Sequence, residues 1–190
     1  MADWRDDVLQ FWFGELTNED RFGGAADVDA KIRERFGSLC QRLSKAVPPQ
    51  AMTDPMTALA AVIVYDQFPR NIHRGKPEAF ASDRMAVEVA RNALEKGLDR
   101  EIAPERRAFL YMPFMHSEAL SDQERCVELF RSVGNEEAMK YAVEHRDIIA
   151  RFGRFPHRNR ALGRQTTPAE AEFMKTHSGY GQKSDEPDQA

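Results

Sequence analysis

The sequence has few cysteines, no long apolar run and no strong excess of one charge. Its two cysteines, Cys40 and Cys126, lie far apart and form no Cys-x-x-Cys pair, which argues against a zinc site or a secreted disulfide framework. The longest apolar run, Ala58–Tyr65, is much shorter than the ~20 residues that a membrane-spanning helix needs. The formal charge of -4 gives no general reason to expect a nucleic-acid partner.

Motifs that would bind a nucleotide or a metal are also missing. The sequence has no Gly-x-x-x-x-Gly-Lys-Ser/Thr phosphate loop, no dinucleotide fingerprint and no His-Glu-x-x-His pair. Imidazole and carboxylate ligands for a metal could come from six side chains, namely His73, His116, His145, His157, Asp66 and Glu118. Because no recognised ligand spacing joins these residues, we predict no metal site and no cofactor.

Length and composition indicate one cytoplasmic domain. A chain of 190 residues is about the size of a single domain. The start, Met1–Asp7, is acidic and has no basic stretch before an apolar one, so we expect no secretory signal and a cytoplasmic location. We place a single helical domain at residues 1–177 and a disordered polar tail at residues 178–190, where almost nothing is available for burial.

Start and stop signals for helices recur along the whole chain. No run alternates apolar and polar residues for long enough to argue a strand. The predicted fold class is therefore all-α, with seven to eight helices. Short turns between them make neighbouring helices antiparallel, so we expect a helical bundle or a short superhelix.

Prolines mark several predicted helix ends. Asp54 can cap a helix that begins at Pro55, and because that helix is nearly all apolar, we expect it to lie at the centre of the core. Pro69 should end it. A later helix can begin at Pro104, and Pro113 predicts a kink or an end within it.

Two further helix starts are predicted from capping boxes. Ser121–Glu124 and Thr167–Glu170 both have the spacing in which a hydroxyl and a carboxylate satisfy each other's exposed backbone donors. Between them, Asn135 can cap a helix whose apolar stripe runs from Ala138 to Phe152 and includes Tyr141 and His145. A histidine on such a stripe predicts a buried, hydrogen-bonded imidazole.

Two Phe-Pro turns carry the densest polar signals. Residues 67–74 read Gln-Phe-Pro-Arg-Asn-Ile-His-Arg, and residues 151–160 read Arg-Phe-Gly-Arg-Phe-Pro-His-Arg-Asn-Arg. Arginine suits carboxylate and phosphate ligands because its planar fork donates paired hydrogen bonds and stays charged. The alternative is that these arginines cap helix C-termini and pair with the chain's own acids.

A resemblance to a known family lies in three motifs. These are Tyr65–Asn71, Tyr111–Glu118 and Arg151–Asn159. Together with Leu162–Arg164 and the Thr167-Pro168 opening, they resemble the bacterial domain of unknown function 924 family over nearly the full chain. The resemblance implies an all-helical, tetratricopeptide-like fold. It implies no established activity, because fold alone does not define function.

Our first hypothesis is that the two turns converge on a small anionic ligand or an acidic peptide segment. The ligand-binding residues that we predict are Arg70, Asn71, His73, Arg74, Arg151, Arg154, His157, Arg158 and Asn159. In this hypothesis the arginines neutralise charge and the asparagines orient the ligand. Phe68 and Phe155 hold the turns in position.

Two alternatives stay open, and whether the chain is an enzyme is not decided by the sequence. A hydrolase- or lyase-type enzyme could use His116, Glu118 and His145 for acid–base chemistry. A protein–protein interaction scaffold is the other alternative. Nucleic acid and membranes are not expected as partners, and the oligomeric state is left open.

Overall fold

The computed structural model describes residues 4–23, 26–134, 136–177 and 179–181, and over these ranges every regular element is helical. The α-helices are α1 (Trp4–Gln10), α2 (Asn18–Phe22), α3 (Ala26–Leu43), α4 (Pro55–Val62), α5 (Phe68–Ile72), α6 (Asp83–Glu95), α7 (Pro104–His116), α8 (Leu120–Val133), α9 (Glu136–Phe152) and α10 (Pro168–Met174). Short π-helical turns span Phe11–Glu15 and Ile63–Gln67, and 3₁₀ turns span Pro49–Met52, Pro77–Phe80, Leu98–Glu101, Pro156–Arg158 and Gly179–Gly181. The all-α prediction is confirmed.

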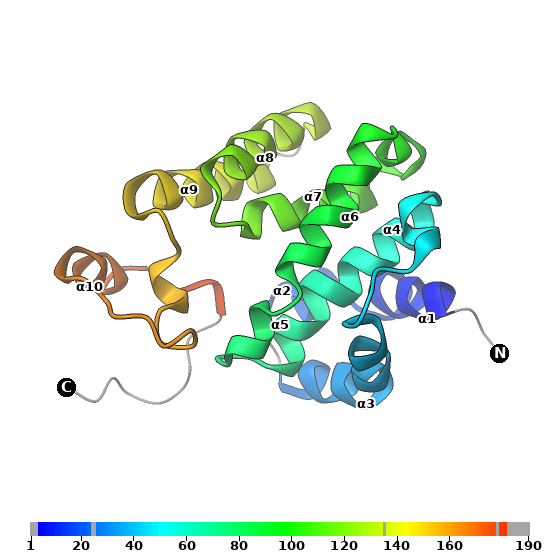
Figure 1. Cartoon of the computed structure of the whole chain (residues 1–190), viewed down its shortest axis with the longest axis horizontal. Coiled ribbons are helices and arrows are strands. Elements are labelled where there is room, and N and C mark those ends of the chain that lie inside the picture. Colours follow the sequence, from blue (N-terminus) through cyan, green and yellow to red (C-terminus); the bar gives the residue numbers. More distant parts are fainter. Residues whose placement is uncertain (1–3, 24–25, 135, 178, 182–190) are drawn as a thin grey trace.

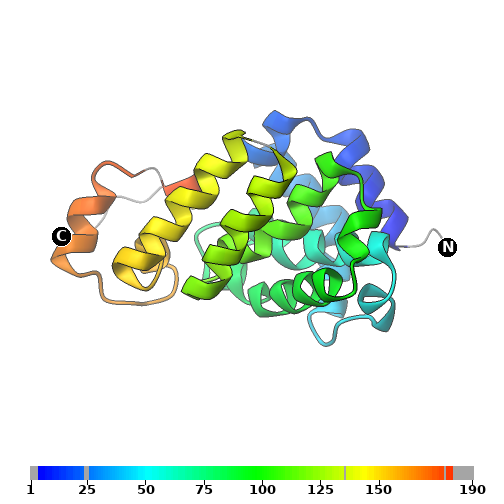
Figure 2. The ribbon, with the colours of Figure 1, turned by 90° about the horizontal axis from the view of Figure 1, so that it is seen from above.

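From α6 to α9, each helix packs against the next, as the short connections between them require. Helix α8 lies between α7 and α9, and α3 packs against α5 (Figure 1). Helix α4 contacts α1, α6 and α7. Seen from above, α1 and α10 lie at opposite ends of an elongated molecule, and α9 is the last long helix before α10 (Figure 2). None of the helices in the described ranges has the length and apolarity to cross a membrane.

Helix α4 lies at the centre of the main core, as its apolar sequence predicts. Residues Ala58–Ile63 are fully buried. Its start follows the predicted chemistry, because the Asp54 carboxylate accepts a hydrogen bond from the Thr57 backbone N–H at 2.7 Å and Pro55 occupies the first helical position.

The prediction that Pro69 ends this helix is wrong. The chain passes from α4 through the π-helical turn Ile63–Gln67 into α5, and helical structure continues to Ile72. Pro69 has no N–H to bond to the Tyr65 carbonyl four residues earlier. The Ser82 hydroxyl donates to that carbonyl instead, at 2.8 Å, so a side chain from the start of α6 replaces the missing backbone bond.

Pro113 does not end α7, which runs on to His116. The predicted capping box at Ser121–Glu124 is also wrong, because α8 begins earlier, at Leu120, and Gln123 lies inside it. The buried Gln123 side chain donates to the carbonyls of Met115 and Ser117, both at 2.6 Å. A glutamine therefore satisfies the carbonyls of Met115 and Ser117 at the end of α7.

The end of α9 and the chain that follows it build a smaller apolar cluster apart from the main core. Ile148, Ile149 and Phe155 are its buried members, and Phe173 and Tyr180 pack against it. The predicted capping box at the start of α10 is present, because the side chain of Thr167 accepts from the Glu170 N–H and the Glu170 carboxylate accepts from the Thr167 N–H. This cap helps to dock α10 beside α9.

The predicted tail at residues 178–190 falls mostly outside the described residues, which omit 178 and 182–190. The described part, Gly179–Gly181, forms a 3₁₀ turn. Tyr180 in this turn stacks on His145, with 4.2 Å between the ring centroids.

We predict that Phe68→Ala lowers the free energy of unfolding by about 3–5 kcal/mol, because it leaves a cavity in the main core. Phe68 is fully buried and its ring lies 4.7 Å from that of Phe36. Phe22→Ala is the matched control, because Phe22 is 62% exposed and its loss should cost less than about 1 kcal/mol. Chemical denaturation measures both values, and equal costs would contradict the assigned core.

Candidate functional site

The two Phe-Pro turns meet at one carboxylate, that of Asp83 in the first turn of α6. Arg70 donates to both oxygens of this carboxylate, at 2.9 and 3.0 Å. Arg158, from the second turn, lies 3.4 Å from its Oδ2. The guanidinium groups of both arginines also lie over the Phe80 ring, 5.7 and 4.7 Å from its centroid. Residues far apart in sequence therefore share one polar centre.

A second carboxylate, that of Asp66, also contacts Arg70 and binds His116. Asp66 is fully buried in the π-helical turn, and its two oxygens lie 2.8 and 2.9 Å from Nδ1 of His116. Arg70 Nη1 is 3.2 Å from Oδ1, and Gln67 Nε2 donates to Oδ2 at 2.6 Å. Each of these neighbouring groups is a hydrogen-bond donor, so the surroundings of Asp66 stabilise its ionised carboxylate.

Neighbouring charges set the protonation of this pair. Burial alone would raise the pKa of Asp66, but Arg70 and His116 outweigh it and hold that pKa well below its usual range. Burial, aided by Arg70 and Arg158, lowers the pKa of His116. At neutral pH, Asp66 is therefore an anion and His116 a neutral imidazole, and Nδ1 carries the hydrogen because a carboxylate can only accept.

Arg158 is the most deeply buried cation of the turns, with 6% of its surface exposed. It lies over the Phe155 ring at 4.5 Å and donates from Nη2 to the His116 carbonyl at 2.9 Å. Its Nε has no hydrogen-bond partner within the described ranges. Burial first, then Arg70, lowers the pKa of Arg158 to about 10, so the side chain stays charged at neutral pH.

Two further arginines of the motifs are held by acids of the chain. Arg74 pairs with Asp29 at 2.9 Å, and Asn71 donates to the same carboxylate. Arg154 pairs with Glu170 at 2.6 Å. These contacts match the alternative in which arginines of the turns pair with the chain's own carboxylates.

The residues proposed for catalysis do not form one triad. Glu118 accepts from Arg164 at 2.8 Å and from the Phe155 backbone N–H at 2.8 Å, so it fixes the second turn. His145 is buried as predicted, its Nδ1 lies 2.8 Å from the Tyr141 carbonyl, and its ring centroid is 6.3 Å from that of His116. The carboxylate beside His116 is Asp66, which is the only charged residue between positions 55 and 69.

The remaining predicted site residues lie at the edges of this centre. Asn159 is buried, and its side-chain oxygen accepts from Arg164 Nε at 3.0 Å. His157 is half-buried, and its Nδ1 has no hydrogen-bond partner in the part of the chain that the structure describes. His73 follows α5 at the end of the first turn and is half-buried. Within the same part of the chain, no three metal-ligating side chains cluster.

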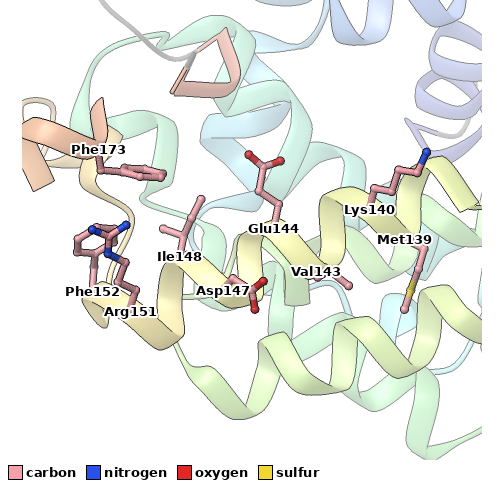
Figure 3. A pocket seen from close by; sticks show the side chains of 9 residues that line it. All are labelled: Met139, Lys140, Val143, Glu144, Asp147, Ile148, Arg151, Phe152 and Phe173. Atoms are coloured by element: carbon pink, nitrogen blue, oxygen red, sulfur yellow. The ribbon is translucent and has the colours of Figure 1, made fainter. Parts of the chain in front are cut away.

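Arg151 lies elsewhere, in a groove of about 520 Å³ along α9 that α10 closes at one end. Figure 3 shows the side chains that line this α9–α10 groove. They are Met139, Lys140, Val143, Glu144, Asp147, Ile148, Arg151, Phe152 and Phe173. Along α9 the charged members follow the order Lys140, Glu144, Asp147 and Arg151, so the two anions lie between the two cations.

The cations and the anions of this groove differ in how they are engaged. Glu144 lies 3.4 Å from His177, and Asp147 pairs with Arg146 at 2.6 Å. Lys140 and Arg151 have no carboxylate within salt-bridge distance among the described residues. The Arg151 guanidinium lies over the Phe152 ring at 4.6 Å. Lys140 and Arg151 are therefore the two cations of a lining that also holds two carboxylates, and neither cation is paired with one of them.

We predict that Asp83→Ala lowers the free energy of unfolding by about 3–5 kcal/mol, because it leaves two buried guanidinium groups without their shared carboxylate. The control is Glu128→Ala, whose pair with Arg125 is exposed and should be worth less than about 1 kcal/mol. Denaturant titrations give both costs. A small effect at Asp83 would mean that the two turns are not joined there.

Comparisons with known proteins agree with this architecture. The family described as bacterial protein of unknown function (DUF924) matches residues 8–178. The structure of ATU0120 from Agrobacterium tumefaciens, a protein of unknown function, is similar with a TM-score of 0.86 and 33% identity, over 91% of this chain and 97% of that one. A search of curated proteins found no match. With its helical fold and all three sequence motifs inside the matched range, the chain belongs to the DUF924 family.

Proposed function

We propose that the protein binds an acidic peptide segment in the α9–α10 groove. The observation that carries the proposal is the pairing of an open apolar floor with two cations, Lys140 and Arg151, that no described carboxylate neutralises. Apolar side chains of the peptide would bury against Val143 and Phe173, and its carboxylates would meet the two cations. The proposal keeps the cytoplasmic location and the helical-repeat-like binding surface expected from the sequence.

The spacing of the two cations suggests the length of the segment. Lys140 and Arg151 lie on one helix, so the rise per residue separates their Cα atoms by roughly 16 Å along the axis. An extended peptide advances about 3.3 Å per residue, so about five residues cover this distance. We therefore propose a segment with acidic residues about five positions apart and apolar residues between them.

The polar centre at Asp83 is a weaker candidate for the same ligand. Arg70 and Arg158 already share the Asp83 carboxylate, and Arg154 already binds Glu170. A small anion would have to displace a carboxylate from a buried arginine, and breaking such a pair costs about 3–5 kcal/mol. Binding of an anion to Arg151 breaks no such pair, because within the described structure its exposed guanidinium lies over the rings of Phe152 and Phe173 and forms no ion pair.

We predict that the double variant Lys140→Glu/Arg151→Glu weakens binding of an acidic peptide at least about tenfold, because attraction at both ends of the groove becomes repulsion. A fluorescein-labelled peptide of sequence Asp-Leu-Val-Phe-Leu-Asp serves as the probe, and fluorescence anisotropy gives the Kd. Added salt should weaken the parent complex.

Two controls make this test specific. Arg125→Glu changes a cation at a separate hollow between α6 and α8 and should leave the Kd unchanged. A peptide with lysine in place of both aspartates should bind poorly to the parent and better to the double variant. Equal affinity of the acidic peptide for the parent and the double variant would exclude the groove as its site.

A second candidate function is general-base catalysis by His116. The favouring observation is the Asp66–His116 pair, in which Nδ1 is held by a buried carboxylate and Nε2 makes no hydrogen bond to any described residue. The His116 side chain is 18% exposed, so part of it is within reach of a substrate. His116 does not line the α9–α10 groove, so a ligand in that groove would not reach it. We therefore rank catalysis second.

We predict that ¹⁵N NMR at neutral pH shows His116 with its hydrogen on Nδ1 and a bare Nε2, because Asp66 accepts from Nδ1. His116→Gln should then abolish any turnover of p-nitrophenyl acetate above the buffer rate, and His73→Gln should not. A hydrogen on Nε2 at neutral pH, or equal turnover in both variants, would remove this candidate.

A further inference from the structure

The residues that follow α10 form a short C-terminal latch, defined here as His177 together with Gly179–Gly181. The His177 side chain is buried and its ring stacks on Phe173, with centroids 4.8 Å apart. Tyr180 stacks on His145 of α9 at 4.2 Å and meets the His177 ring edge-on at 4.6 Å. The latch therefore links α10 to α9, and one of its contacts is Phe173, the closed end of the α9–α10 groove.

Packing holds the latch in a backbone conformation that is unfavourable by itself. Tyr180 has φ 53° and ψ 38°, in the left-handed region that side chains other than glycine rarely occupy. Such a residue keeps this conformation only where its surroundings hold it there. The Tyr180 ring contacts those of His145, His157 and His177, so its packing depends on the state of these imidazoles.

Four of the five histidines of the chain gather at the latch. The rings of His116 and His145 lie 6.3 Å apart, and those of His157 and His177 lie 6.1 Å apart. His157 also meets Tyr180 edge-on at 5.5 Å. These side chains come from α7, α9, the Pro156–Arg158 turn and the latch itself, so a charge on one of them acts on every element that the latch joins.

We propose that this histidine cluster is an acid-sensitive release for the latch, in which protonation of His145 and His157 frees the latch and, with it, the Phe173 end of the groove. Its consequence for ligand binding rests on the proposed function. At neutral pH His145 and His157 are uncharged, the latch is closed and the groove is complete. On acidification the latch opens and the groove loses its closed end.

The direction of the pH dependence follows from burial and from the neighbouring cations. Burial first, then His116, lowers the pKa of His145 to about 3. Burial first, then Arg158, lowers the pKa of His157 to about 2. In an open state both pKa values return to about 6.5. The stability that the two neutral histidines contribute to the closed latch is therefore fully present above about pH 6.5. It is lost as the pH falls from there toward 3.

The other charged groups that face the cluster do not reverse this direction. From the second turn, Arg158 disfavours charge on both histidines. Glu144 would attract a protonated His177, but its side chain is 47% exposed, and exposed ion pairs contribute little. Asp66 faces His116 and is already matched by Arg70. No described carboxylate pairs with His145 or His157.

Hydrogen–deuterium exchange at about pH 7 and about pH 5 tests the proposal, with protection factors corrected for the intrinsic rate. In the parent, peptides covering residues 168–181 should lose at least about tenfold in protection at the lower pH, and those from α4 and α7 should keep theirs. The variant His145→Phe/His157→Phe retains ring packing but cannot titrate, so it should keep latch protection at both values. His73→Phe is the control and should behave like the parent.

Three results would overturn the proposal: unchanged latch protection in the parent, simultaneous loss in α4 and α7, or a loss in the double variant equal to that in the parent. A melting curve at neutral pH checks that the double variant folds, and the single variant His157→Gln replaces it if it does not. Failure of the acidic peptide to bind at neutral pH would instead refute the proposed function and leave the exchange result standing.

Discussion

The carboxylate of Asp83 accepts from two arginines that the chain supplies from separate halves, and the rest of the polar structure depends on this arrangement. Arg70 and Arg158 can share it only if both Phe-Pro turns lie against the start of α6. Phe80, beneath both guanidinium groups, fixes how closely they approach. Buried ion pairs add little net stability over apolar packing, but they tolerate few alternative geometries. The network therefore specifies where the second turn sits relative to the first.

That constraint propagates to the α9–α10 side of the molecule. Arg158 donates to the carbonyl at the end of α7, and Glu118 binds both Arg164 and the backbone of Phe155. These contacts direct the chain after α9 into a fixed path, which brings Phe173 of α10 against Phe152 at the end of α9, where the groove forms. The arginines of the motifs thus shape the α9–α10 groove mainly by pairing inside the protein, and Arg151 is left exposed at that groove.

The fold could be predicted from the sequence wherever local chemistry decides the structure. Asp54 and Thr167 cap helices as predicted, because each cap needs only residues three positions away. The predictions at Pro69 and at Ser121–Glu124 were wrong because the hydrogen-bond partners that determine the structure there lie outside the segment that was read. Ser82 replaces the bond that Pro69 removes, and Gln123 serves the end of α7. The composition of a segment does not reveal such partners.

The candidate site was predictable in part. The turns identified the arginines, but the acids that hold them, Asp83 and Glu170, lie in helices whose sequences look like ordinary solvated faces. Asp66 had a usable signal, since it is a lone charge in an apolar helix four residues before Arg70. The groove had none, because it exists only when Phe173 of α10 comes to lie beside α9.

The most direct test of this account is an NMR titration that follows arginine Nε–H resonances while an acidic peptide is added to the parent protein. The account predicts that the Arg151 signal shifts with saturation and that the signals of Arg70, Arg154 and Arg158 stay in place, because their guanidinium groups are held by Asp83 and Glu170. Shifts confined to Arg70 and Arg158, with Arg151 unmoved, would contradict it and return the ligand to the Phe-Pro turns.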